Sequence, residues 1–384
     1  MILNDDTRLQ KASELMDAFT KRTGFMESGK TQRRYLWTDA FAVCNFLGLY
    51  EKSGEEKHLL RAKRLVDEVH RVLGYYREDD SCSGALNGLP DREASWHPTA
   101  GGLRIGKTEP ERGEDEAYDE QKEWDRDGQY FHYLSKWMHA LDRMAQVTKE
   151  AKYSRWAVEL AKAAHNAFVY TAPDGSRRMY WKMSTDLSRP LVASMGQHDA
   201  LDAYVTYLQL SVTAAGFGAQ AELKTQIEEA GAMAESMPLV TEDPLGLGGL
   251  LVDAARTAQM VAAYQLPLDG MFRAMVEAAA RGLRGFMKSD LLRYDARHRL
   301  AFRELGLEIG LHAVEPMRRL RDEELPGLQT LQEFEPLAQA LELFWLRDEH
   351  RNTPLWREHR DIDEVMLATS LLPDGFLKIS EGWK

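Results

Sequence analysis

The chain has 384 residues, of which 44% are hydrophobic and 29% charged, and its formal net charge is −12. This apolar content argues against a disordered chain, which lacks the buried surface that offsets the entropy of ordering. The acidic balance argues against nucleic acid and anionic membranes, because both attract a basic face. We therefore expect neither as a partner.

The chain contains two cysteines, Cys44 and Cys82. Two thiols are too few for the disulfide framework of a small secreted scaffold or for a four-thiolate zinc site. The N-terminal residues 1–11 have no apolar signal core, and no segment offers the roughly 20 uninterrupted apolar residues of a membrane span. We expect a soluble, cytoplasmic protein.

Apolar residues recur at helical spacing along most of the chain, and strand-like alternation hardly appears. The predicted helices come in pairs that are joined by short Gly, Pro or charged turns. The six pairs are 35–50 with 59–73, 130–147 with 153–169, 198–215 with 223–237, 247–266 with 271–287, 302–317 with a return to 345, and 356–372 with a turn at 373–375.

The two helices of a pair differ in kind. First helices are apolar nearly all round, which is typical of a helix buried on most sides, whereas second helices such as 59–73 carry one apolar stripe and one charged face. An inner ring of buried helices within an outer ring of amphipathic ones satisfies both patterns. We predict an all-α fold, an (α/α)6 toroid of six helical hairpins that forms a single domain over residues 1–384.

This pattern of six hairpins resembles the (α/α)6 barrel of the six-hairpin glycosidase superfamily, which also includes sugar 2-epimerases. The resemblance covers nearly the whole chain after about Thr31 and is architectural. It implies a carbohydrate-active enzyme with a small saccharide as substrate. Because a fold does not determine a function, the site has to be argued from residues.

Two long connections, 74–129 and 170–197, are expected at the mouth of the barrel, because loops of that length are usually functional or disordered. In 97–107 (HPTAGGLRIGK) the glycine pair predicts a tight turn that presents Arg104 and Lys107. Aromatic residues at the starts of the inner helices and in these loops are suited to stacking on sugar rings. They are Trp37, Trp124, Tyr130 and Trp181.

Polar side chains on inner helices are costly unless they are paired or hydrated, so we expect them to line one water-filled cavity. Glu304, Glu308 and His312 recur at i, i+4 and i+8 on the fifth inner helix. The predicted substrate-binding residues are Trp37, Asp39, Arg104, Trp124, Tyr130, His132, Trp181, Gln197, Arg303, Glu308 and His312.

Glycoside hydrolysis needs one protonated and one ionised carboxyl group astride the scissile bond. We expect Glu304 on the fifth inner helix to be the acid and Asp127 on the second to be the base. His198 and Asp199, at the start of the third inner helix, complete the candidate catalytic set. No HExxH, Walker A, GxGxxG or GxSxG motif occurs, so no metal or cofactor is expected.

Other interpretations stay open. His132, His198 and His312 would suit a sugar epimerase, because imidazoles exchange protons near neutral pH. A non-catalytic sugar-binding or scaffold protein would instead have an apolar plug at its axis. Acids at helix starts also have a structural explanation, since they complement the helix dipole, and the Glu304 to His312 line would serve as a hydrogen-bond ladder between helices.

Overall fold

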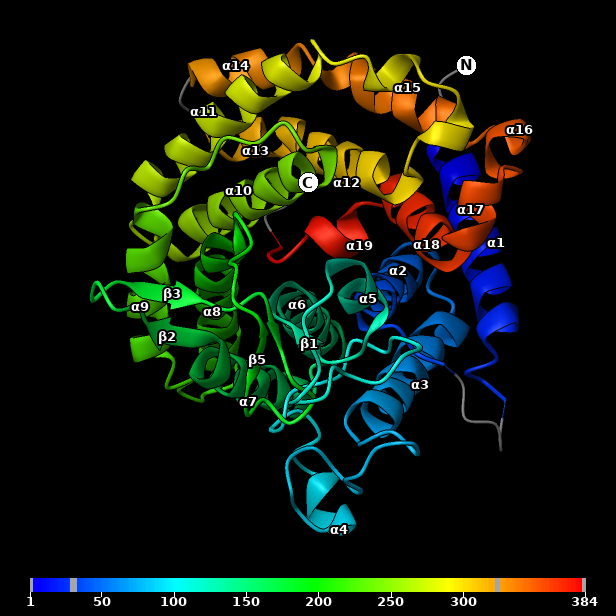
Figure 1. The fold of residues 1–384 in the computed structure, drawn as a ribbon. Coiled ribbons are helices and arrows are strands. Elements are labelled where there is room, and N and C mark those ends of the chain that lie inside the picture. Colours follow the sequence, from blue (N-terminus) through cyan, green and yellow to red (C-terminus); the bar gives the residue numbers. More distant parts are fainter. Residues whose placement is uncertain (1–2, 28–32, 322–324, 382–384) are drawn as a thin grey trace. The chain divides into compact units, whose positions relative to one another are not determined.

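A computed structural model of the chain describes residues 3–27, 33–321 and 325–381. The fold is mostly helical, with 64% helix and 5% strand, which confirms the predicted all-α class of helical hairpins (Figure 1). The chain divides into two compact units. The first unit comprises Met1–Arg22, Cys44–His58 and Pro238–Lys384, and the second comprises Thr23–Val43 and Leu59–Met237. Closure of the hairpins into one toroid and one domain stays a prediction.

The first three predicted hairpins form within a few residues of their expected bounds. They are α2 (Leu36–Ser53) with α3 (Glu56–Leu73), α6 (Phe131–Thr148) with α7 (Ala151–Phe168), and α8 (Asp199–Gly216) with α9 (Lys224–Glu235). In the second unit α6 packs against both α7 and α8. This explains why α6 is apolar on most sides, with side chains such as Trp137 and Leu141 fully buried.

The two long loops of the second unit contain short elements that periodicity did not reveal. The first loop forms α4 (Asp91–Ala94) and α5 (Glu120–Asp125), and the second forms a hairpin of β2 (Val169–Thr171) and β3 (Arg177–Met179). A three-stranded antiparallel sheet in the order β1-β4-β5 joins Gln129–Tyr130, Lys182–Met183 and Pro190–Val192. Strands of two or three residues are too short to show alternation.

The fourth predicted hairpin is confirmed in the first unit, but the fifth and sixth are broken into shorter helices. Besides the C-terminal part of α2 and the first residues of α3, the elements of the first unit are α1 (Asp5–Thr23), α10 (Pro244–Tyr264), α11 (Asp269–Phe286), η1 (Leu291–Arg293), η2 (Ala296–His298), α12 (Ala301–His312), α13 (Val314–Leu320), α14 (Pro326–Gln332), α15 (Glu335–Trp345), α16 (Asp348–Arg351), α17 (Pro354–Glu358), α18 (Arg360–Leu371) and α19 (Asp374–Leu377). Prolines stand in the first turns of α14, α15 and α17. Proline lacks the amide hydrogen that a helix interior needs, so it starts new helices here.

Glycines bring α10 and α12 into close contact in the first unit. A Cβ atom at Gly248 would lie 2.0 Å from the carbonyl oxygen of Gly306, and one at Gly310 would lie 2.8 Å from the carbonyl oxygen of Gly248. Both distances are too short for any side chain, so glycine is required at this crossing. The other sides of α12 pack against α15 and α18, and its carboxyl groups Glu304 and Glu308 are buried.

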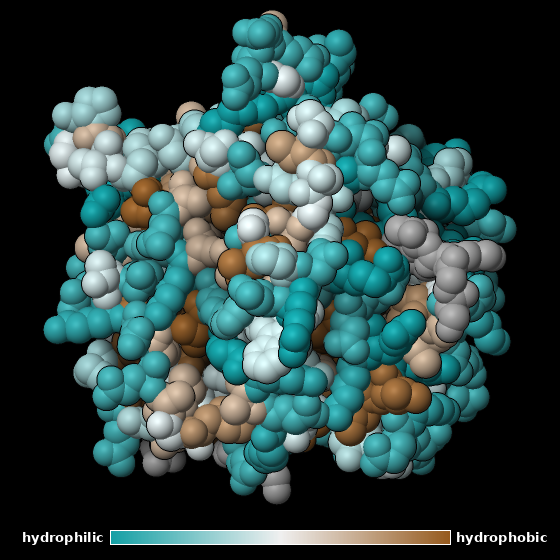
Figure 2. All heavy atoms as spheres, turned by 90° about the horizontal axis from the view of Figure 1, so that it is seen from below, coloured by the Kyte–Doolittle hydropathy of each residue, from teal (hydrophilic) through white to brown (hydrophobic). Residues whose placement is uncertain are grey.

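The surface in Figure 2 is mostly hydrophilic, and its apolar side chains form small separate groups. Large exposed apolar side chains include Leu60, Trp96 and Trp124. Within the described residues, no helix combines the length and the apolar character needed to cross a membrane.

Candidate functional site

Four of the predicted substrate-binding residues meet in the second unit, in a group that we call the aromatic stack: Trp124, Tyr130, His132 and Trp181. The rings of His132 and Trp181 are stacked with centroids 6.1 Å apart, and those of Tyr130 and His132 are stacked at 5.2 Å. Trp124 meets Trp181 edge-on at 5.1 Å and is 51% exposed. The stack therefore runs from a buried tyrosine to an indole that solvent can reach.

A buried ion pair supports the aromatic stack. The Lys182 ammonium donates to the Glu123 carboxylate at 2.8 Å and to the carbonyl oxygens of Glu123 and Arg126 at 2.8 and 2.9 Å. The same ammonium lies 5.3 Å from the centre of the Tyr130 ring, and burial lowers the pKa of Lys182. Sequence reasoning missed this pair. The available signal was a lone lysine inside the apolar segment 179–183.

Two carboxyl groups one turn apart begin α8. Asp202 accepts hydrogen bonds from the Ser135 hydroxyl and from the Lys136 ammonium, the latter at 2.8 Å. Asp199 is 7% exposed, and the backbone amide of Gly196 donates to it at 3.2 Å. Burial, and next the charge of Asp202, raise the pKa of Asp199 to about 7. The two environments therefore differ, which is the pattern of an acid and base pair.

The carboxyl pair and the aromatic stack are continuous through α6. Ser135 and Lys136 stand about one turn after His132 on that helix. Burial, and next the charge of Lys136, lower the pKa of His132 to about 3 against the opposing effect of the Asp202 charge. The donors to Asp202 and the imidazole of the aromatic stack therefore lie on the same helix, within about one turn of each other.

Gln197 and His198 immediately precede α8, and the side chain of Gln197 is exposed while that of His198 is half-buried. Both therefore lie beside Asp199 in the chain. Sequence reasoning found these two residues and Asp199, but it left Ser135, Lys136 and Asp202 outside the candidate set.

Asp127 lies in the segment between α5 and β1, so its expected placement on an inner helix is wrong. Its side chain is fully buried, with one oxygen accepting from the Arg104 guanidinium at 2.5 Å and the other from the amides of Gly106 and Lys107 at 2.9 and 3.3 Å. Arg104 also donates to the carbonyl oxygens of Val72 and Tyr75. These contacts hold a loop in place.

The glycine turn forms as expected, with Gly102 at φ +74°, but Arg104 is buried rather than presented to solvent. Trp37 is also buried, with its ring 4.4 Å from that of Phe41. Asp39 accepts from the backbone amide of Tyr35 at 3.2 Å, which matches the structural interpretation of an acid at a helix start.

In the first unit, Glu304 is engaged by cationic and indole donors. The guanidinium of Arg299 donates to its two oxygens at 2.7 and 2.6 Å, and the indole of Trp345 donates at 2.8 Å. The neighbouring Arg303 donates to Asp243. The three donors to Glu304 satisfy a buried carboxyl group, so the contacts favour a structural role over that of an acid. Glu304 and Asp127 belong to different units, and their action as a pair stays a prediction.

Glu308 and His312 lie further along the same face of α12. The imidazole Nε2 is 3.5 Å from a Glu308 oxygen. The partner helix α15 contributes Trp345 beside Glu304 and Glu342 beside Glu308. The predicted polar line is therefore real, and part of it braces α12 against α15.

No known protein-family model matches this chain, and no curated protein is significantly similar to it.

Proposed function

We propose that the protein is a glycoside hydrolase whose site lies in the second unit, where Asp199 and Asp202 stand beside the aromatic stack. The observation that carries this proposal is the contrast between the two carboxyl groups. Asp202 has an ammonium and a hydroxyl donor, whereas a single backbone amide donates to the buried Asp199 among the contacts of the described residues.

The contrast suits the chemistry of glycosidic bond cleavage. The reaction needs a carboxylic acid that protonates the leaving oxygen and a carboxylate that activates water or attacks carbon. With a pKa of about 7, Asp199 keeps a large protonated fraction at neutral pH. Residues three apart on a helix have Cβ atoms roughly 5–6 Å apart, so Asp202 is near enough to act on the same bond.

The aromatic stack supports a saccharide as the ligand. A sugar ring has an apolar face that packs on indole and phenol rings, and its hydroxyls need nearby polar groups. Trp124 and Trp181 offer such faces, with Trp124 half-exposed. The carboxyl groups and Lys136 supply hydrogen-bond partners within the same unit.

The alternative of a sugar epimerase is less well supported. Burial lowers the pKa of His132 to about 3 and that of His312 to about 4. A base whose pKa lies this far below neutrality abstracts a carbon-bound proton inefficiently, because proton transfer is best when the pKa is near the working pH.

The test is a hydrolysis screen of the purified protein against p-nitrophenyl glycosides and disaccharides, including uronic acids. For a cleaved substrate we expect Asp199→Asn to lose about 10²–10⁴-fold in turnover and Trp181→Ala to raise KM. Asp115→Asn and Trp96→Ala are matched controls, because both side chains are exposed and lie outside the site. Near-normal turnover of Asp199→Asn would contradict the proposal, and isomerisation of a reducing sugar without release of a second sugar would favour the epimerase.

A further inference from the structure

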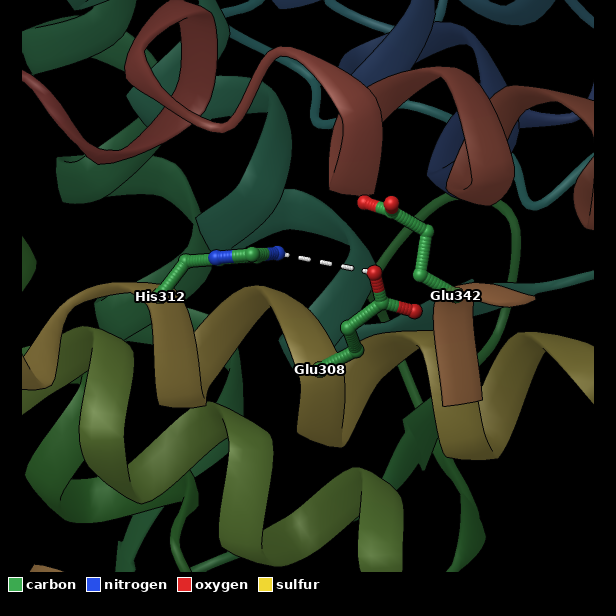
Figure 3. Close-up of side chains that lie close together, drawn as sticks. All are labelled: Glu308, His312 and Glu342. Carbon is green, nitrogen blue, oxygen red and sulfur yellow. Dashed lines mark ion pairs between the residues drawn. The ribbon is translucent and has the colours of Figure 1, made fainter. Parts of the chain in front are cut away.

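A second cluster of polar side chains lies in the first unit, where Glu308, His312 and Glu342 are turned toward one another (Figure 3). Glu308 and His312 stand one turn apart on α12 and therefore point to the same side. Glu342 comes from α15, which packs against α12. One ligand atom from each residue lies within 4.8 Å of the other two.

The carboxyl group of Glu308 has an ionisable neighbour on its own helix, the imidazole of His312 at 3.5 Å. The Glu308 side chain is fully buried, and neither oxygen has a hydrogen-bond donor among the described residues. The nearby Ser370 hydroxyl donates to the carbonyl oxygen of Leu367 at 2.9 Å instead. Buried carboxyl groups are normally paired with a cation, bound to a metal or protonated, and a bound cation would supply a contact for these two oxygens.

Among the described residues, the cluster has more carboxyl groups than cationic side chains. The Arg8 guanidinium lies 2.8 Å from one oxygen of Glu342, and it is one cation beside two carboxyl groups. The His312 Nε2 lies 3.5 Å from a Glu308 oxygen and has no hydrogen-bond partner among the described residues, so it can act as a ligand.

We propose that Glu308, His312 and Glu342 bind one divalent transition-metal ion. This site goes beyond the proposed function and does not depend on it. An imidazole with two carboxylates suits Zn²⁺, Fe²⁺ or Mn²⁺, and three protein ligands leave a position for water. The spacing explains why the sequence showed no metal motif, because the third ligand comes from another helix.

Binding requires the side chains to move closer together. Three ligand atoms bonded to one ion at about 2.0–2.2 Å lie roughly 3.3–3.8 Å from one another at trigonal or tetrahedral angles, whereas these atoms lie within 4.8 Å of one another, so the longest separation must shorten by about 1 Å or more. The side chain of His312 is 20% exposed, which gives an ion a route from solvent.

The test is calorimetric titration of the full chain, stripped with EDTA, with ZnCl2, and with MnCl2 and MgCl2 for comparison. We expect one equivalent of Zn²⁺ to bind, more tightly than Mg²⁺. Glu308→Gln and His312→Gln should each weaken binding at least about tenfold. The matched control is Glu349→Gln, because Glu349 is an exposed carboxylate 3.6 Å from the ring of His350. The Zn²⁺ affinity of this variant should equal that of the wild type.

Thermal melting of the same proteins separates metal binding from a folding defect. Glu308→Gln removes a buried ionisable group that has no hydrogen-bond donor among the described residues, so without metal it should melt no lower than the wild type. Zn²⁺ should raise the melting temperature of the wild type and leave that of Glu308→Gln unchanged. Failure of the wild type to take up stoichiometric Zn²⁺, or unchanged affinity in both ligand variants, would overturn the site. These readouts need no substrate, so they are independent of the hydrolysis screen.

Discussion

Replacing Asp199 by asparagine should change how the stability of the protein depends on pH. Asparagine has almost the same shape, and its side-chain oxygen can still accept from the Gly196 amide. The substitution removes the titrating group and leaves the surrounding contacts in place. It is therefore a direct test of the electrostatic environment that the proposed acid requires.

The magnitude follows from the pKa shift of Asp199, from 3.8 to about 7. Between these values the unfolded chain releases the proton and the folded chain retains it, so the stability of the wild type falls as the pH rises through this window and levels off above it. At about 1.4 kcal/mol for each pKa unit, the full cost is at most about 4 kcal/mol. Below pH 4 the group is protonated in both states and contributes nothing.

The assay is urea unfolding at pH 5 and pH 8, followed by tryptophan fluorescence. The advantage of Asp199→Asn over the wild type should be larger at pH 8 than at pH 5 by about 2–3 kcal/mol, since roughly two of the three pKa units lie in that interval. Other titrating groups cancel in this comparison, and Asp115→Asn should behave like the wild type. An equal difference at both pH values would refute the reasoning, because it would place the pKa of Asp199 near its ordinary value.

Three further substitutions test other contacts. Glu304→Gln leaves the buried Arg299 without its counter-charge and should cost about 3–5 kcal/mol in urea unfolding; a loss below about 1 kcal/mol would show that the pair is not structural. Lys182→Met leaves three acceptors without their donor, so we expect a loss of about 2–4 kcal/mol and altered tryptophan emission, and an unchanged emission spectrum would argue against its role under the stack. Gly248→Ala puts a methyl group 2.0 Å from the Gly306 carbonyl oxygen and should lower the stability by at least about 1–3 kcal/mol, whereas an unchanged melting temperature would mean that the α10–α12 contact opens easily.

Much of the secondary structure follows from local patterns. The hairpins α6–α7 and α8–α9 lie close to their expected bounds, because each has a long apolar periodicity and a clear turn. The last third of the chain was harder to predict, since prolines restart helices at 326, 336 and 354 within one continuous amphipathic pattern. In the two long loops, β1 pairs with β4 from the other loop, which local propensity does not record, and the β2–β3 and β4–β5 pairs are too short to show alternation.

The candidate site shows the same division. Sequence reasoning selected Trp124, Tyr130 and Trp181 as aromatic residues and His132 as a polar residue of an inner helix, and the structure brings these four together. It did not distinguish among the acids. Glu304 and Asp199 both begin apolar helices, yet the first meets a guanidinium and the second meets one backbone amide within the described chain. Their different surroundings arise from contacts that spacing does not encode.

The amino-acid sequence by itself determined the helical class, the pairing of helices into hairpins and the two long loops, because hydrophobic periodicity and turn residues act over short distances. Only the tertiary structure decided which carboxyl groups are paired with a cationic side chain and which are buried without such a partner. A carboxyl group's pKa depends on burial and on neighbouring charges, and for Glu308 and Glu342 the relevant neighbours come from different helices. The packing of these helices against each other decides which groups become neighbours.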